Sequence, residues 1–394
     1  MRKRLLDAFR LLLPLGPSRR RDLAALAAYL SEQELSDVRY LAKLRRIGFH
    51  PRRLETSEEF FPDKGWPELS LAVEDEETGA FVRRINAKVT DAALLETFDE
   101  LKKDALDRLQ KLVAPNIVGL DAAKRAAALQ LFAAEPVHIL LVGDPGTGKT
   151  EILRSIKRLA PHAVFGLGSG ASKAGLTGVY DGKEFHPGLL VLADEGIALV
   201  DELNLLKKED AAGLYSAMEK GFITYDKKGK HERFDARVRV LSTANPKGGR
   251  FVGKDVRFLK SQLPFEEALL SRFHLFFLVR KPSDRELEEI TRRIVKQDIR
   301  ELPDGDTRLV QAYVRYAEKL VVTFDPKYES MVVNFVDDLK RAEKELVAEV
   351  SPRLVIGVIR LAKAFARARL SRHTGAEDVE AAMRLMKDAL AGKA

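Results

Sequence analysis

Eight consecutive residues of this chain have the types and spacing of a phosphate-binding loop. The segment Gly143-Asp144-Pro145-Gly146-Thr147-Gly148-Lys149-Thr150 follows an apolar run, Val137 to Val142, and precedes a helix-like segment that begins at Glu151. A strand, a glycine-rich loop and a helix in that order are what a P-loop requires. The loop from Gly143 to Glu151 would wrap a triphosphate with the backbone N–H groups of its residues other than Pro145, Lys149 would reach the β- and γ-phosphates, and Thr150 would hold Mg²⁺. The pattern predicts ATP and Mg²⁺ as cofactors.

Two further strand ends carry residues that suit the same chemistry. Ile197 to Val200 is a short apolar strand-like run that ends in Asp201-Glu202, and Val238 to Ala244 is another strand-like segment, which ends in Asn245. An aspartate at the end of a core strand can bind the Mg²⁺ held by Thr150, and the neighbouring Glu202 can polarise the attacking water. Asn245 could position that water against the γ-phosphate.

Two arginines are candidates for charge stabilisation. Arg272 precedes the apolar run Leu275 to Val279, and Arg353 follows Ser351-Pro352 at the predicted start of a helix. Either side chain could be an ordinary surface cation. In an oligomeric ATPase, Arg272 could instead reach the γ-phosphate of a neighbouring subunit as an arginine finger, with Arg353 as a second arginine.

These residues need a scaffold that brings strand ends together. Strand-like and helix-like segments alternate over residues 114–282, which predicts an α/β core with a parallel sheet flanked by helices. Residues 283–394 are predicted to form an α-helical lid, broken near Pro303-Asp304-Gly305. Residues 1–62 predict a small basic helical domain with winged-helix character, and residues 63–113 predict a β-hairpin followed by a charged helix from Asp91 to Val113.

Composition narrows the possible classes of protein. The 394 residues include no cysteine, which excludes disulfides and cysteine-based zinc sites, so no zinc is expected. No apolar run is long enough to cross a bilayer, so we expect a cytoplasmic protein without a membrane partner. The net charge of +8 is concentrated in residues 1–53, and residues 224–260 and 351–373 are also basic. Each basic stretch is either a contact for a polyanion or a solvated surface.

An ordered set of motifs resembles the minichromosome maintenance (MCM) helicases of the AAA+ ATPases. The segments that carry the resemblance are Ala114-Pro115-Asn116-Ile117-Val118-Gly119, Gly143-Asp144-Pro145-Gly146, Ala174-Gly175-Leu176-Thr177, Leu190 to Ile197, Ala244-Asn245-Pro246, Leu270-Ser271-Arg272-Phe273, Leu309 to Ala317, Ser351-Pro352-Arg353-Leu354 and Leu361 to Arg367. The resemblance covers roughly residues 92–390.

The resemblance implies a ring, most often a hexamer, that moves DNA through its channel with the help of replication or loader proteins. Residues 175–187 would form one inserted hairpin, and residues 223–236 a second hairpin with a basic tip in the channel. Lys227 matches the family's channel lysine, with Lys228 and Lys230 beside it. The resemblance also implies that Lys149, Thr150, Asp201, Glu202 and Asn245 act on the subunit's own ATP. Arg272 and Arg353 would act on the ATP of a neighbour.

Several positions depart from the family pattern. Gly148 stands where the family usually has alanine, and His274 stands where it has aspartate. The first inserted hairpin is short, and the family's N-terminal zinc and OB-fold region has no counterpart in the first 90 or so residues. The favoured function is an ATP-dependent DNA helicase or translocase. The alternatives are an AAA+ protein remodeller and a DNA-binding regulatory paralogue that does not unwind.

Overall fold

The structure is a computed structural model that describes residues 97–168, 173–181, 184–207, 210–227, 230–253, 255–295 and 304–393. The chain divides into two units after Lys103, and the elements below belong to the second, Asp104–Ala394. The predicted basic domain over residues 1–62 and the hairpin predicted before residue 90 lie outside the described residues. None of the described helices is long and apolar enough to span a bilayer.

A five-stranded parallel sheet forms the centre of this unit. Its strands are β1 (Ile139–Gly143), β2 (Ala163–Leu167), β5 (Ile197–Asp201), β8 (Arg239–Ala244) and β9 (Leu275–Val279), in the order β2-β5-β8-β1-β9. Every residue of β1, β5, β8 and β9 is buried, as expected for a parallel sheet covered on both faces. The sheet confirms the predicted α/β core.

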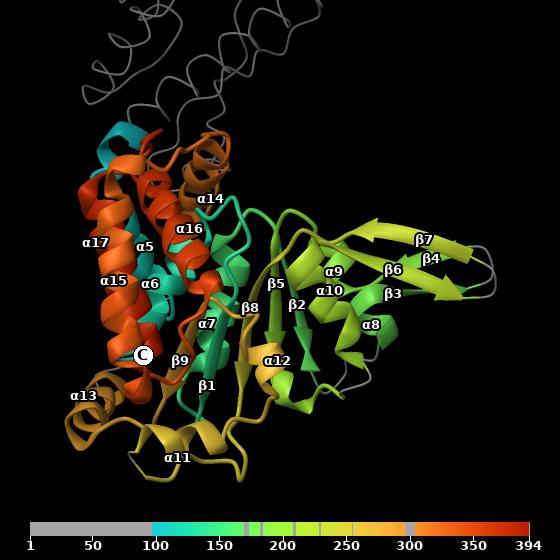
Figure 1. The fold of residues 1–394 in the computed structure, drawn as a ribbon, viewed down its shortest axis with the longest axis horizontal. Helices are drawn as coiled ribbons and strands as arrows, with labels where there is room; N and C mark the ends of the chain where they lie inside the picture. The colour runs from blue at the N-terminus through green and yellow to red at the C-terminus, as the bar shows by residue number, and fades with distance from the viewer. Residues whose placement is uncertain are drawn as a thin grey trace, which may run out of the picture. The chain divides into compact units, whose positions relative to one another are not determined.

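Helices cover the sheet, and two hairpins extend from it. The helices of the core are α5 (Ala105–Leu112), α6 (Asp121–Gln130), α7 (Lys149–Leu159), α8 (Lys173–Thr177), α9 (Leu189–Leu192), α10 (Ala212–Lys220), α11 (Val256–Ser261) and α12 (Glu267–Leu270). The hairpins pair β3 (Gly178–Asp181) with β4 (Glu184–Pro187) and β6 (Phe222–Lys227) with β7 (Lys230–Asp235). Figure 1 shows both hairpins projecting together beyond the β2 side of the sheet.

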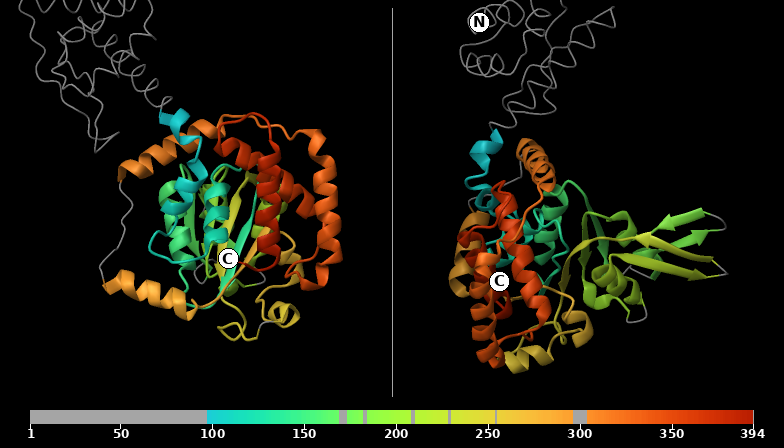
Figure 2. Two further views of the ribbon diagram at one scale, coloured as in Figure 1. Left: turned by 90° about the vertical axis from the view of Figure 1, so that its left-hand side faces the viewer. Right: turned by 45° about the horizontal axis from the view of Figure 1, so that its top comes forward.

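The helical lid predicted for the C-terminal region is confirmed. It comprises α13 (Asp284–Val295), α14 (Asp304–Glu318), α15 (Glu329–Arg341), α16 (Pro352–Ala368) and α17 (Ala376–Leu390). The helices gather on the β9 side of the sheet, away from the hairpins (Figures 1 and 2). Pro303 precedes α14, but Gly305 lies inside that helix, so the predicted break ends earlier than expected.

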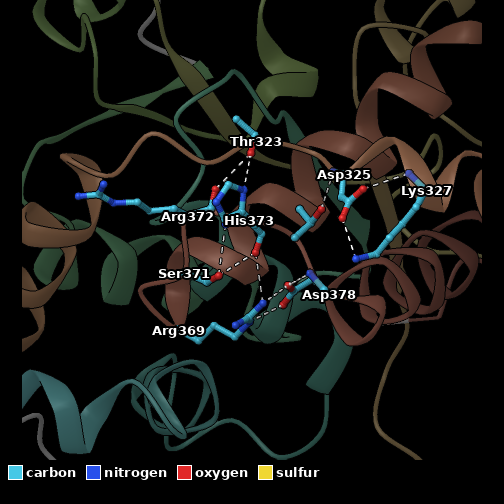
Figure 3. Close-up of polar contacts among 10 residues, drawn as sticks. Thr323, Asp325, Lys327, Arg369, Ser371, Arg372, His373 and Asp378 are labelled. Atoms are coloured by element: carbon cyan, nitrogen blue, oxygen red, sulfur yellow. Dashed lines mark hydrogen bonds and ion pairs between the residues drawn. The ribbon is translucent and has the colours of Figure 1, made fainter.

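Polar contacts fix the turn between α16 and α17 (Figure 3). Arg369 donates two hydrogen bonds to Asp378, from Nε to Oδ1 at 3.0 Å and from Nη2 to Oδ2 at 2.7 Å. The Asp378 carboxylate also accepts the N–H of Gly375 at 2.7 Å, at the start of α17. Thr323 donates its N–H to the carbonyl of Arg372 at 3.0 Å, which ties the segment before α15 to the same turn. The lid is therefore held by specific bonds as well as by apolar packing.

Four cations of the basic stretch 351–373 bond to other segments of the chain. Arg360 and Lys363 ion-pair with Glu135, at 3.3 and 2.8 Å. Arg367 donates to the carbonyl of Phe132 at 2.7 Å, and Arg353 donates to the carbonyl of Ser271 at 2.5 Å. These cations dock α16 on the core, because each satisfies an oxygen of another segment. In this structure these four side chains therefore bond to the protein itself rather than standing free in solvent.

One predicted helix is interrupted. The charged segment 91–113 was expected to be a single helix, and of its described residues, 97–101 and α5 are helical, with a turn between them at residues 102–104. The apolar face of α5 is buried through Leu106 and Leu109. Ala114 then adopts a left-handed φ of 46°, which ends the helical region where the sequence predicted a break.

Candidate active site

The glycine-rich loop joins β1 to α7 through conformations that favour glycine. Gly146 and Gly148 have φ values of 76° and 87°, which side chains rarely adopt. A Cβ at Gly143 would lie 2.1 Å from the carbonyl oxygen of Val279, so β1 and β9 approach closely at this point. Gly148 directly precedes α7. The loop therefore leads into a helix N-terminus, where backbone N–H groups can bind phosphate.

Lys149 is folded back onto this loop. Its Nζ donates to the carbonyls of Gly143 and Asp144, at 2.8 and 2.7 Å, and lies 3.4 Å from the hydroxyl of Thr147. The lysine is buried, and desolvation lowers its pKa to about 8 despite the nearby Asp144 and Asp201. An anion in the loop would favour the charged ammonium, because it would replace neutral carbonyls by a full opposite charge.

The acidic pair meets the P-loop helix and the adjacent strand. Asp201, at the end of β5, accepts on Oδ1 from the hydroxyl of Thr150 at 3.2 Å and from the hydroxyl of Thr243. Thr243 also accepts the N–H of Glu202 at 3.0 Å, and Glu202 has a left-handed φ of 54°. Thr150 and Asp201 thus offer adjacent oxygen ligands, the type that Mg²⁺ prefers. Their chemistry fits the predicted metal site.

Asn245 follows β8 at the same edge of the sheet. Its N–H donates to the side-chain oxygen of Asn204 at 2.9 Å, and Asn204 lies in the short 3₁₀ turn after Glu202. This contact joins the ends of β5 and β8 a second time. Asn204 and Thr243 were not predicted as site residues, since nothing in the local sequence around either one signals a contact across strands.

Asp144 has a different environment from the one expected of a phosphate-facing residue. Its carboxylate accepts the N–H of Phe251 at 2.8 Å and lies 3.4 Å from the N–H of Lys281. The side chain therefore holds the loop after β8 and the segment after β9 against the P-loop. Only the backbone of Asp144 remains for a ligand in this arrangement.

The other P-loop positions are distributed around the turn. Thr147 donates its hydroxyl to the carbonyl of Asp144 at 2.8 Å, which closes the loop on itself. Pro145 lies between Asp144 and Gly146 in the turn before α7. Glu151, in the first turn of α7, ion-pairs with Arg154 at 2.7 Å on the surface. The Glu151 side chain thus contacts its own helix, leaving its backbone as the group nearest the predicted ligand.

The two candidate arginines lie together, away from the P-loop. Arg272 ion-pairs with Glu219 at 2.7 Å and lies over the ring of Tyr215 at 4.9 Å, and this cation lowers the pKa of the Glu219 carboxyl. Arg353, in the first turn of α16, donates to the carbonyl of Ser271. Desolvation, followed by repulsion from Arg272, lowers the pKa of Arg353. The two guanidinium groups thus form one basic cluster.

The arginine cluster lies near the amino-terminal ends of the parallel strands, whereas the P-loop lies at their carboxyl-terminal ends. Lys149, Asp201 and Asn245 follow or end parallel strands, whereas Arg272 precedes β9. A strand of five residues is about 16 Å long. Arg272 therefore does not share a site with Lys149 of the same chain.

His274 packs behind the arginine cluster against a second histidine. The Nδ1 atom of His274 accepts the N–H of His138 at 3.0 Å, and the two rings are 5.3 Å apart. The Nδ1 atom of His138 accepts the N–H of Val240 at 3.1 Å, so its Nε2 donates to the carbonyl of Met218. Burial lowers the pKa of His138 to about 3 and that of His274 well below its usual value. Both rings are neutral supports at the start of β1 and β9.

The predicted basic hairpin is present as β6 and β7. Lys227 and Lys230 end the two strands and pair with each other in register, next to the turn. Lys228 lies outside the described residues. The backbone therefore places Lys227 and Lys230 at the end of the hairpin farthest from the sheet (Figure 1).

The fold and the loop define the class of protein. A parallel sheet of order β2-β5-β8-β1-β9, a P-loop between β1 and α7, an acidic pair at the end of β5 and a helical lid identify a P-loop ATPase domain of the AAA+ type.

Comparison with known families places the chain more closely. The family model of the MCM P-loop domain matches residues 94–298, and that of the MCM AAA-lid domain matches residues 308–390. The chain belongs to the MCM family, as the sequence motifs predicted.

Individual relatives agree with this assignment. The chain is 31% identical over 338 residues to the minichromosome maintenance protein MCM of Saccharolobus solfataricus, an alignment that covers 77% of this chain and 48% of the relative. It is 32% identical over 344 residues to DNA replication licensing factor MCM4 of Arabidopsis thaliana, covering 78% and 40%. It is 30% identical over 315 residues to DNA replication licensing factor mcm7 of Schizosaccharomyces pombe, covering 71% and 41%. The chain thus spans about half or less of the length of these relatives.

Proposed function

We propose that this chain hydrolyses ATP at the interfaces of a ring and uses the reaction to move along DNA and separate its strands. One observation carries the proposal: Lys149 and Asp201 lie at the carboxyl-terminal ends of the parallel strands, and Arg272 lies before the amino-terminal end of β9. A single chain therefore carries the two halves of an ATP site, the P-loop with its acidic pair and the arginine cluster, at opposite ends of its strands. Head-to-tail association of identical chains would bring these halves together, and such contacts close into rings.

The chain's own half of the site would bind and activate the substrate. Lys149 would exchange its loop carbonyls for the β- and γ-phosphates. Thr150 and Asp201 would hold Mg²⁺, which supplies positive charge against the phosphates. Glu202 would accept a proton from water as the water oxygen bonds to the γ-phosphorus and the bond to the bridging oxygen of ADP breaks. Asn245 would orient that water, and the products are ADP and phosphate.

The neighbour's half would supply arginine. Arg272 would leave Glu219 and approach the γ-phosphate of the adjacent subunit, where its charge stabilises the transition state. Arg353 bonds to the carbonyl of Ser271, directly before Arg272, so both cations would arrive together. A hexamer is the assembly that the family resemblance favours.

The basic hairpin would contact DNA. Lys227, Lys228 and Lys230 flank or form the turn of β6–β7, and lysines bind the phosphate backbone without reading bases. Contacts of this kind suit a translocase, because each step along DNA meets the same backbone. Replication or loader proteins are the expected partners in placing the ring on DNA.

Displacement of a labelled strand from forked DNA tests this proposal. With ATP, the wild-type chain should release the strand and Glu202→Gln should not, because the variant lacks the general base but keeps the shape of the site. ATP hydrolysis without displacement, unaffected by single-stranded DNA or by Lys227→Ala, would instead support a protein remodeller. ATP binding and DNA binding without hydrolysis would support a regulatory paralogue.

A mixing experiment tests the shared site. Lys149→Ala and Arg272→Ala should each hydrolyse ATP at less than a tenth of the wild-type rate. Rings that contain both variants should regain activity, because some interfaces pair an intact Lys149 with an intact Arg272. Arg237→Ala is a matched control, since Arg237 ion-pairs with Asp194 on the surface. Full activity of Arg272→Ala alone would refute a site completed by a neighbour.

A further inference from the structure

The two hairpins lie side by side, although no backbone hydrogen bonds pair a described strand of one with a described strand of the other. β3–β4 and β6–β7 form independent two-stranded sheets, without strand pairing between them among the described residues. Figure 1 and the right-hand view of Figure 2 both show them projecting side by side. An isolated two-stranded hairpin is marginally stable in water. Side-chain contacts must therefore hold the two hairpins together.

Four aromatic rings make that contact, and we call them the aromatic staple: Tyr180 and Phe185 of β3–β4, and Tyr225 and Phe234 of β6–β7. Phe185 stacks on Phe234 with centroids 3.8 Å apart and planes 7° apart. Tyr180 lies 5.0 Å from Tyr225, and Phe185 meets Tyr225 edge-on at 6.4 Å. The separations of Tyr225 from Tyr180 and from Phe185 are those at which aromatic pairs attract, and the near-parallel rings of Phe185 and Phe234 are in direct contact.

A hydrogen bond and a glycine support the same contact. The Tyr180 hydroxyl donates to the carboxylate of Glu232 in β7, and this bond raises the pKa of Tyr180 to about 12. Gly178 has a φ of 117°, and a Cβ there would lie 2.5 Å from the ring of Phe185. The backbone of β3 thus leaves space for the ring that stacks on Phe234.

Each hairpin leads into a strand that carries catalytic candidates. β4 leads through α9 into β5, which ends at Asp201, and β7 leads into β8, which is followed by Asn245. β5 and β8 are neighbours in the sheet, with Ala198 opposite Val240. A shift of β5 or β8 at its carboxyl-terminal end would therefore also move the start of that strand, to which one hairpin is joined. The aromatic staple then connects that hairpin to the other.

We propose that the aromatic staple locks the two hairpins into one rigid arm, so that changes at the ends of β5 and β8 move the basic turn as a single displacement. Tyr180, Phe185, Tyr225 and Phe234 are positioning residues in this scheme, because they touch neither ATP nor the phosphorus centre. The inference rests on the proposed function for its motor role, but the rigidity of the arm is independent of it.

Hydrogen exchange of the 394-residue chain without nucleotide tests the rigidity. Phe234→Ala removes a ring from β7, yet it should speed amide exchange in β3–β4 (residues 178–187) about tenfold. Phe222→Ala is the matched control, because Phe222 lies in the same hairpin and packs under Arg233 of that hairpin at 3.7 Å. The control should leave exchange in residues 178–187 within twofold of wild type. Unchanged exchange in Phe234→Ala would overturn the staple.

Strand displacement on forked DNA tests the motor role. Phe234→Ala should keep its DNA-free ATPase rate within twofold of wild type but displace about tenfold fewer strands per ATP, and Phe234→Tyr should restore coupling by keeping the stack. Wild-type displacement per ATP in Phe234→Ala would refute the motor role. If the wild-type chain displaced no strand, the helicase proposal would fail, whereas the exchange result would still decide whether the arm is rigid.

Discussion

Replacing Thr243 with valine should slow ATP hydrolysis without weakening ATP binding to a similar degree. Valine keeps the shape of threonine but has no hydroxyl. Thr243 is buried, accepts the N–H of Glu202 at 3.0 Å and donates to Asp201, which also accepts from Thr150. One hydroxyl therefore joins β8 to both members of the acidic pair and, through Asp201, to the P-loop helix.

The size of the effect follows from the backbone of Glu202. A non-glycine residue in a left-handed conformation costs about 1–3 kcal/mol, and Glu202 keeps its φ of 54° with the help of the bond to Thr243. Without that bond, a relaxed backbone conformation of Glu202 becomes more stable than the left-handed one by about 2 kcal/mol. Since 1.36 kcal/mol corresponds to a factor of ten in an equilibrium or a rate, the fraction of enzyme with Glu202 in its catalytic conformation should fall about 30-fold, and kcat with it. KM for ATP should change much less, because Lys149 and the P-loop backbone are untouched.

Steady-state ATPase assays of three variants test this reasoning. Thr243→Ser keeps the hydroxyl and should restore most of kcat. Ser242→Ala is the matched control on the same strand, because Ser242 is equally buried and its hydroxyl has no hydrogen-bond partner among the residues the structure describes. Wild-type kcat in Thr243→Val, or equal losses in Thr243→Val and Thr243→Ser, would refute the role of the hydroxyl.

Two further predictions concern the P-loop. Burial lowers the pKa of Lys149 to about 8, so above that pH the resting lysine is neutral and ATP binding must take up a proton. Affinity for a fluorescent ATP analogue should therefore weaken as pH rises from 8 to 9.5, by up to about tenfold per unit, and a flat profile would contradict the buried lysine. Gly148→Ala should lower the free energy of unfolding by about 1–3 kcal/mol, since φ is 87° and the new Cβ would lie 2.7 Å from Ile117. Gly146→Ala has a similar φ but open space, so urea unfolding should show a smaller loss, and equal losses would exclude the Ile117 contact.

The parallel core could be predicted because its signals are local. β1 and β9 are apolar runs, β5 is apolar up to Asp201, and Lys149, Asp201 and Asn245 each follow or end a strand-like segment. Parallel strands place their carboxyl ends at one edge, so Lys149, Asp201 and Asn245 were expected to meet. The helix predicted over residues 91–113 is interrupted at residues 102–104, where the chain turns although charge and amphipathic period continue across them in the sequence.

Contacts between distant segments could not be predicted in this way. Thr243, Asn204 and the carboxylate of Asp144 matter through partners on other strands or loops, and single positions of these types carry no periodic signal. The partners of the basic stretch 351–373 were missed for a related reason. Arg360 and Lys363 bond to Glu135, and Arg367 bonds to the carbonyl of Phe132, each more than two hundred residues earlier in the sequence.

β8 is the element through which the hairpin arm and the acidic pair can influence each other. β7, which carries Phe234, enters β8 within a few residues, and Thr243 lies near the other end of that strand. Phe234→Ala and Thr243→Val should therefore not be additive in the stimulation of ATPase by DNA. Once Thr243→Val has separated β8 from Glu202, removing the staple should cost little more, with a coupling energy above about 0.5 kcal/mol. A double-mutant cycle measures this energy, and Phe222→Ala in place of Phe234→Ala gives its baseline. Additive losses would mean that the arm and the acidic pair respond to DNA through separate elements.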